Sequence, residues 1–174
     1  MGQLLAGGDA SRLYQGLVKG RELALNMDSL YGLTSIWEYD GPSLFTVFAL
    51  YKPNTTADAL LAGMDEEIAR IVKDGVDDTT LKNLKTALLA DWYNGVEMFL
   101  NRADRLAKLQ ALWGDATVIN KVPGWIAAVT SADVQRVAAT YLTTANRSVI
   151  DRKPAAMLAA PAPAASAAKP ASQP

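Results

Sequence analysis

One long stretch, residues 77–113, constrains the fold of this chain more than any other feature. Its apolar residues recur every three or four positions, which is the period of an α-helix. Polar and charged residues fill the positions between them, so one side of the stretch is apolar and the other faces water. The apolar positions are Leu81, Leu84, Leu88, Trp92, Val96, Phe99, Ala103, Leu106, Leu109 and Trp113. We therefore expect helices here that cover a sheet formed elsewhere in the chain.

The ends of this stretch are marked by their own residues. Asp77 can cap the first free N–H groups, and Val76 and Leu81 have the spacing of a hydrophobic staple. Gly114 marks the C-terminal end. One straight helix over these residues would be about 50 Å long at roughly 1.5 Å per residue, too long for a compact small domain. Because helix propensity is lowest at Asn94-Gly95, we predict a break there and two helices.

The N-terminal third is expected to contain a helix end, a short helix and the main strands. Residues 3–6 are predicted to be the last turn of a helix that Gly7-Gly8 ends. Asp9 is expected to cap a short helix, and its inward-facing residues are Leu13, Leu17 and Tyr14. Residues 23–28 alternate as a half-buried strand does, with Leu23, Leu25 and Met27 on one face. Residues 33–39 alternate less cleanly and are a possible continuation.

The remaining elements complete an α/β fold of the two-layer, α+β kind. Residues 44–51 are apolar on both faces, which is typical of a central strand. A helix follows, with a capping box at Thr55 and Asp58 and an end at Gly75. Beyond the long stretch we expect a short piece at 118–122 that Pro123 breaks, a helix capped by Thr130 and Asp133, and a short strand at 146–150. Trp125, Ile126 and Val129 are expected to be buried. This order favours an antiparallel or mixed sheet with helices on one face.

The domain organisation follows from a change in composition. Residues 1–150 are expected to form one domain, and residues 151–174 an Ala/Pro-rich tail that is disordered or polyproline-like. The opening residues have no basic segment and too short an apolar run for a signal peptide. The chain also holds no run of roughly 20 apolar residues that would span a membrane.

Composition excludes several classes of function. The chain has no histidine and no cysteine, so it lacks the usual zinc ligands, a cysteine nucleophile and disulfides. With 17 basic and 18 acidic residues the net charge is −1, and no clustered basic face indicates nucleic-acid binding. Arg102, Arg105 and Lys108 are interpreted as a solvated helix face. We therefore predict no catalytic and no metal-binding residue in this chain.

Three other features have a structural and a functional interpretation. Gly7-Gly8 is a helix stop rather than a phosphate loop, because no Lys-Ser/Thr follows at the required spacing. The acidic groups at 65–67 and 77–78 fit a solvated face and a helix cap better than paired catalytic carboxylates. Trp92, Trp113 and Trp125 could line a ligand pocket, but we favour core packing.

Several local strings, taken in order, resemble the insulinase-like zinc peptidases, the pitrilysin or mitochondrial-processing-peptidase family. The strings are Leu5-Ala6-Gly7-Gly8-Asp9-Ala10-Ser11-Arg12-Leu13-Tyr14, Leu17-Val18, Leu23-Ala24, Gly75-Val76-Asp77 with Leu81 and Lys85, Gly114-Asp115, Val129 to Ala138, and Tyr141-Leu142. The resemblance spans residues 3–150 and is to a C-terminal half. Such a half begins with a strand and most of a long helix that have no counterpart here, which suggests the distal part of a longer protein. Without that first strand, the sheet of this chain would have an unpaired edge.

The resemblance implies how such a half works. In that family two halves close around an unfolded peptide, and zinc is bound in the N-terminal half by a His-x-x-Glu-His motif that this chain lacks. The C-terminal half supplies an Arg and a Tyr to the substrate. In the matching string, residues 19–25, Lys19 stands in place of the Arg and Leu25 in place of the Tyr, and Lys is a poor substitute for a bidentate Arg.

Three residues are candidates for contact with substrate or partner: Arg12, Lys19 and Arg21. For Arg12 an ion pair within the fold is the competing interpretation, and for Lys19 and Arg21 it is an exposed surface position.

The favoured hypothesis is a C-terminal half that forms a peptide-binding chamber with a zinc-bearing half, on the same or another chain, and is inactive by itself. It would bind no cofactor, because zinc would belong to that partner half. The alternative is a non-enzymatic scaffold or interaction module of the same fold. A third hypothesis, an unrelated α/β domain, would require a different strand order.

Overall fold

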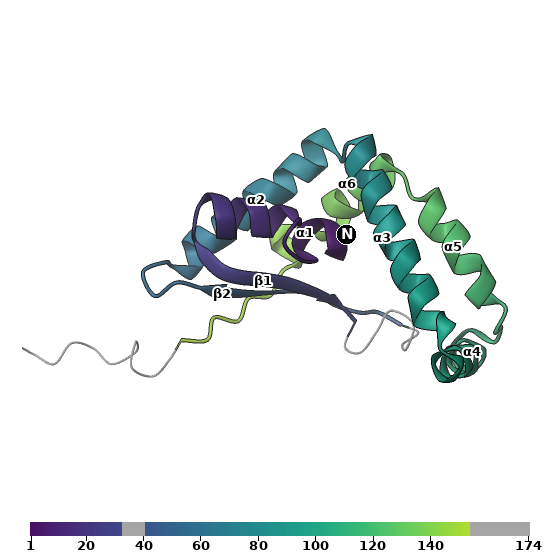
Figure 1. Cartoon of the computed structure of the whole chain (residues 1–174). Helices are drawn as coiled ribbons and strands as arrows, with labels where there is room; N and C mark the ends of the chain where they lie inside the picture. Colours follow the sequence, from purple (N-terminus) through teal and green to yellow (C-terminus); the bar gives the residue numbers. More distant parts are fainter. Residues whose placement is uncertain (33–40, 154–174) are drawn as a thin grey trace, which may run out of the picture.

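The computed structural model describes residues 1–32 and 41–153, which form a mixed α/β fold (Figure 1). Strands β1 (Ala24–Tyr31) and β2 (Phe45–Tyr51) form an antiparallel sheet. Helices α1 (Gly2–Ala6), η1 (Tyr14–Gly20, a π-helix) and α2 (Ala57–Asp74) lie on one side of this sheet. The fold class predicted from the sequence is therefore confirmed. Residues 33–39, a possible strand, and the predicted tail from residue 154 onwards lie outside the described residues.

The C-terminal half of the described chain is helical. It contains α3 (Asp78–Glu97), α4 (Phe99–Trp113), α5 (Val118–Ala128), α6 (Ser131–Tyr141) and the 3-10 turn η2 (Thr144–Asn146). Helix α6 packs against α2, while α4 and α5 pack against α3 and each other. Figure 1 shows α4 and α5 at the end of the molecule away from the tip of η1.

The long stretch forms two helices, as predicted, but the break lies at Met98 instead of Asn94-Gly95. Met98 has extended backbone angles (φ −65°, ψ 129°), and Gly95 stays helical. The Arg102 guanidinium donates to the carbonyls of Val96 (2.9 Å) and Glu97 (3.3 Å) at the end of α3. Because these carbonyls lose their helical donors at the corner, a partner for them stabilises the break there.

The corner at Met98 also changes which residues are buried. Phe99 was expected on the apolar stripe but is 84% exposed, because α4 restarts the helical phase in a new direction. Trp92 is buried as predicted, whereas Trp113 and Trp125 are about half exposed and lie against each other with ring centroids 6.1 Å apart and ring planes tilted by 30°. The predicted core position is thus correct for Trp92 and wrong for the other two. Val129, also expected inside, is 38% exposed.

The helix caps follow the sequence closely. Asp77 accepts from the backbone N–H of Thr80 (2.8 Å), and Gly114 ends α4 in the left-handed region. Thr130 and Asp133 form the predicted capping box with both reciprocal bonds. Helix α2 is capped one residue later than predicted, by Thr56, whose hydroxyl accepts from Ala59 N–H (3.2 Å). No bond from the Asp9 side chain to η1 occurs in the described part of the chain, where instead the Asp9 carbonyl accepts from Gln15 (2.6 Å).

Two C-terminal expectations need correction. Helix α5 continues through Pro123 instead of breaking there. Residues 146–150 were expected to be a strand, but Asn146 ends the 3-10 turn η2 and residues 147–150 join no ladder within the described residues. The prediction that Leu25 lies on the inner face of the first strand is also wrong. Ala24 pairs with Tyr51 and Asn26 pairs with Leu50, so Leu25 is an extra, bulged residue. Leu25 is therefore 52% exposed while Met27 is buried.

Two separate hydrophobic clusters hold the fold together. The larger joins α1, η1, β1, α2 and α6 around Leu5, Leu13, Leu17 and Ile71, all with no exposed surface. The smaller joins α3, α4 and α5 around Trp92, Leu109, Val118 and Val122. Helix α3 therefore links the two, with Leu81 and Leu84 packed on the first cluster and Trp92 in the second.

We expect Asp77→Ala to lower the free energy of unfolding, because it removes the acceptor for the Thr80 N–H in the first turn of α3. Urea unfolding followed by far-UV circular dichroism measures this change. The neighbouring Asp78→Ala keeps that cap and is the matched control, with a smaller expected loss. Equal losses for the two variants would contradict a specific capping role of Asp77.

Candidate functional site

The candidate site is the surface of η1 and the helix α2 on which it lies. Two of the three candidate residues brace these elements. The Arg12 guanidinium, just before η1, donates to the carbonyl of Gly75 at the C-terminal end of α2 (3.2 Å). Arg21, just after η1, pairs with Glu66 in the middle of α2. The structure therefore places Arg12 apart from Arg21, and each makes a bond within the fold.

Lys19, the third candidate, lies on the last turn of η1. Its ammonium stands 5.7 Å from the centroid of the Tyr14 ring, one helical turn earlier. The side chain is exposed, so it can reach another molecule without losing a buried contact. Lys19 and Arg21 thus lie together at one end of η1, whereas Arg12 lies at the other.

Alternating charges surround this end of η1. Glu66 accepts from Arg21, and Lys52 donates to Glu22 (3.0 Å). The bond from Arg21 holds the pKa of the Glu66 carboxyl below its usual value, and Glu66 in turn raises the pKa of Arg21. The bond from Lys52 likewise lowers the pKa of Glu22. These carboxylates are ionised partners of cations rather than proton donors, so the geometry suits ionic and hydrogen-bonding contacts, not acid–base chemistry.

Close packing of η1 on α2 depends on two glycines that the sequence analysis did not single out. A Cβ on Gly63 would lie 2.6 Å from Leu17 Cδ2, and one on Gly16 would lie 2.9 Å from Glu67 Oε1. Helices η1 and α2 can therefore approach each other closely at Gly16 and Gly63, because neither residue carries a side chain. Glu67 is only 5% exposed and pairs with Arg70 (2.6 Å), which corrects the expectation that residues 65–67 form a solvated face. The helical period does place position 67 inward, seven residues after Leu60 and four before Ile71, but its charge led to the interpretation as a solvated residue.

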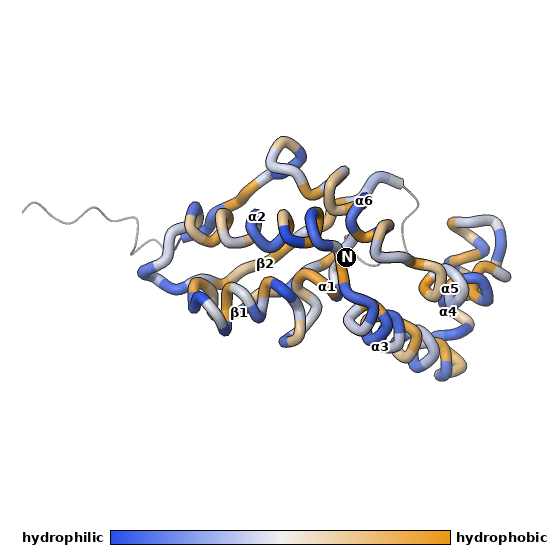
Figure 2. Tube along the Cα trace, turned by 90° about the horizontal axis from the view of Figure 1, so that it is seen from above, coloured by the Kyte–Doolittle hydropathy of each residue, from blue (hydrophilic) through white to orange (hydrophobic). Residues whose placement is uncertain are grey.

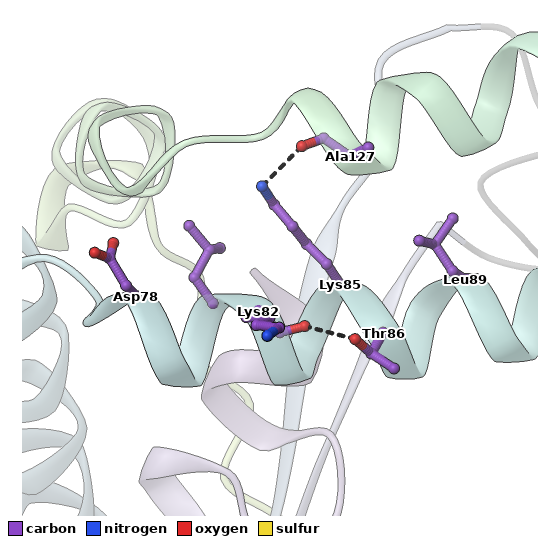
Figure 3. Close-up of a pocket in the computed structure, with 7 residues that line it drawn as sticks. Asp78, Lys82, Lys85, Thr86, Leu89 and Ala127 are labelled. Carbon is purple, nitrogen blue, oxygen red and sulfur yellow. Dashed lines mark hydrogen bonds between the residues drawn. The ribbon is translucent and has the colours of Figure 1, made fainter.

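A second surface feature is a hollow of about 300 Å³ between α3 and the end of α5 (Figure 3). The Lys85 ammonium crosses it and donates to the Ala127 carbonyl (2.8 Å), as Figure 3 shows. Leu81 and Leu89 line its apolar side. The Lys85 ammonium is already bonded to a carbonyl of α5, so it connects α3 to α5. The hollow is therefore a weaker candidate for a functional site than the η1 surface.

The residues do not fit a zinc ion. The whole sequence lacks histidine and cysteine, and the described residues contain no group of three or more acidic side chains placed to hold a metal. Zinc sites in proteins are built from Cys, His and carboxylate ligands, with His in nearly all catalytic ones. We therefore derive no metal-dependent step in this chain. No helix among residues 1–32 and 41–153 has both the length and the apolar character needed to cross a membrane.

Comparison with known proteins gives consistent matches. The family profile described as "Peptidase M16 inactive domain" matches residues 1–88. An uncharacterized zinc protease from Streptomyces coelicolor is 29% identical over 157 residues, which cover 90% of this chain and 31% of that protein.

Solved structures show the same fold. A protease from Helicobacter pylori is 22% identical with a TM-score of 0.69, covering 82% of this chain and 33% of that one. A structure described as the inactive peptidase domain of a candidate zinc protease from Bordetella parapertussis is 20% identical with a TM-score of 0.71, covering 84% of this chain and 76% of that one. This chain thus spans about a third of the length of the first two relatives and most of the third.

Proposed function

Because this chain belongs to the M16 peptidase family and matches its inactive domain, we propose that it completes a peptide-binding chamber with a zinc-bearing half. That half would lie on the same polypeptide or on a second one. The observation on which this proposal rests is the combination of family membership with a sequence that has no histidine and no cysteine. The chain can supply a wall of the chamber, while the zinc and the attacking water belong to the other half.

The η1 surface is the part of this wall that we propose contacts the peptide or the partner half. Lys19 presents an exposed ammonium, which can donate to a carbonyl or carboxylate of an extended peptide. Arg21 offers the guanidinium N–H groups that Glu66 leaves unused, because a guanidinium has five donors. Arg12 is bonded to Gly75 and half-buried, so in this proposal it positions η1 instead of contacting substrate.

The test is reconstitution from separate halves. The purified chain is mixed with a zinc-bearing half of an M16 protein, and cleavage of an unstructured labelled peptide is followed together with bound zinc. We expect no cleavage and no zinc with the chain alone, and cleavage only in the mixture. Zinc uptake or cleavage by the chain alone would overturn the proposal. So would a stable complex that leaves cleavage at the level of the zinc-bearing half alone.

Charge removal on η1 refines the test. We expect Lys19→Ala and Arg21→Ala each to raise the KM of the reconstituted enzyme by about threefold to tenfold, with a smaller effect on kcat, because exposed charges act mainly on encounter and orientation. The matched control is Lys82→Ala on α3, an exposed lysine outside the η1 surface. Equal KM values for all three variants would contradict a contact role for η1.

A scaffold role is the second candidate, and Leu25 favours it. The family resemblance expects a tyrosine at this position, whereas Leu25 is a bulged residue with its side chain 52% exposed. A scaffold would form the complex with its partner half but would not change the rate of peptide cleavage. Sedimentation of the mixture, run beside the cleavage assay, separates the two functions.

A further inference from the structure

The side of α4 that points away from the protein is apolar and exposed. Helix α4 packs on α3 and α5 through the side that carries the buried Leu109. On the opposite side, the helical period brings five exposed residues onto one surface. They form the outer face of α4: Leu100, Ala103, Ala107, Gln110 and Ala111. Because all five are exposed, no other part of the described chain covers this face.

The outer face of α4 is supported by the second half of the chain alone. The smaller hydrophobic cluster beneath it is formed by residues between Trp92 and Ile126, whereas Met1 packs on the larger cluster. Figures 1 and 2 both place α4 and α5 at one end of the molecule, away from α2. At the corner where α4 begins, Met98 is 64% and Phe99 is 84% exposed. Large apolar side chains that gather on a surface indicate an interaction site.

Large and small side chains are distributed unequally along this face. Leu100, which is 74% exposed, lies at the N-terminal end of α4, whereas Ala107 and Ala111 lie towards its C-terminal end. When two copies of the helix pack antiparallel, the large end of each copy lies against the small end of the other. Leu100 of one copy then fits over Ala111 of the second copy, and this contact occurs twice.

The residues along the two edges of the face match in the same way. Asp104 and Lys108 lie along one edge, and Phe99 and Trp113 lie along the other. The pairs Asp104–Lys108, Phe99–Trp113 and Leu100–Ala111 are all centred on Leu106 or immediately before it. One two-fold axis at this point therefore brings opposite charges together between the copies, and also aromatic rings. Asp104 and Lys108 already form an ion pair within one copy (2.9 Å), so both side chains are oriented along this edge.

We propose that this chain forms an antiparallel, two-fold symmetric dimer through the outer face of α4. A two-fold interface uses the same surface on both copies, and this face matches itself in size and in charge. Its alanines let two helix axes approach closely. One helix face is a small interface, so the dimer should be weak and depend on concentration. The contact requires neither zinc nor the η1 surface, so it stands or falls apart from the proposed function.

Sedimentation equilibrium of the full chain, run over a range of concentrations, tests for the dimer. Ala107→Glu places a carboxylate close to the axis, where it meets the same group of the second copy and loses hydration. We expect this variant to raise the dissociation constant by about tenfold or more. The matched control is Ala69→Glu, which makes the same change at an exposed position of α2 and should leave the constant unchanged. Circular dichroism checks that both variants fold.

Cross-linking tests the antiparallel orientation. The native chain has no cysteine, so Leu100→Cys and Ala111→Cys each introduce a single thiol. A mixture of the two variants should form disulfides quickly on mild oxidation. Each variant alone should react slowly, because the two copies of one residue lie about 17 Å apart along the helices, too far for a disulfide.

Several results would overturn the proposed dimer. One is a chain that stays monomeric at concentrations up to about 1 mM, and another is equal weakening by Ala107→Glu and Ala69→Glu. Faster cross-linking of each cysteine variant alone than of the mixture would rule out the antiparallel arrangement. A monomeric chain that binds phosphatidylcholine vesicles, and loses this binding in Ala107→Glu, would show that the face binds lipid instead of a second copy.

Discussion

Replacing Gly75 with alanine is expected to lower the free energy of unfolding by about 2–5 kcal/mol, from backbone strain and overpacking together. Gly75 ends α2 with φ 71° and ψ −149°, a combination that is strained for any residue with a Cβ. A Cβ there would also lie 2.7 Å from Ser131 Oγ and 3.0 Å from Gln135 Cδ. Guanidinium unfolding followed by circular dichroism measures the loss.

The loss should be large because Gly75 lies where three parts of the chain are bonded together. Its carbonyl accepts from Arg12 (3.2 Å), and the next residue, Val76, exchanges two bonds with the Ser131 hydroxyl (2.9 and 2.8 Å). Gln135 donates to the last carbonyls of α2. A Cβ that displaces Ser131 and Gln135 leaves these carbonyls and the Val76 N–H without partners, which costs further stability when they are shielded from water.

Gly95→Ala is the matched control for this prediction. Gly95 lies inside α3, and a Cβ there would meet nothing within 4 Å. Alanine should therefore stabilise the helix by about 0.5–1 kcal/mol, because glycine loses more conformational freedom on folding. A Gly75→Ala variant as stable as the native chain would show that the junction relaxes around the extra carbon.

The elements predicted correctly are those set by neighbouring residues. Asp77, Gly114 and the Thr130–Asp133 box lie within four residues of the groups that they cap, so the sequence order alone reveals them. The break at Met98 was missed because Arg102, beyond the corner, supplies the hydrogen bonds that compensate the end of α3. Helix propensity at Asn94-Gly95 is the weaker effect once those carbonyls are satisfied.

Burial and pairing were harder to predict because they depend on distant residues. Leu25 alternates correctly in the sequence, but the bulge moves it off the inner face. The apolar pattern of β2 predicted a central strand, and in the described residues it pairs along one edge only. For Arg12 the sequence left open a contact with substrate or an ion pair within the fold, and its bond in the structure is to a carbonyl 63 positions away. Charge and spacing place a residue on an element, but they do not reveal which long-range partner it meets.

The second large effect concerns the division of the core into two clusters. We expect Trp92→Ala to cost about 3–5 kcal/mol, because it empties the centre of the smaller cluster. Trp92 is only 6% exposed, packs in the cluster that contains Leu109 and Val122, and has the Arg105 guanidinium 4.7 Å from its ring. The indole fills the space between α3, α4 and α5, and alanine leaves a cavity that three helices cannot all close.

This loss should be local, and hydrogen exchange can show where it falls. Amides of α4 and α5 are expected to lose protection in Trp92→Ala, because these helices pack on α3 through the smaller cluster. Amides of β1 and α2 belong to the larger cluster and should keep most of theirs, since regions with separate cores can open separately. Trp113→Ala is the matched control: its ring is 45% exposed and lies against Trp125, so the expected cost is only about 0.5–1.5 kcal/mol. Equal loss of protection in α2 and α4 would mean that α3 couples the clusters into one cooperative unit, and the two-cluster division would then have no energetic meaning.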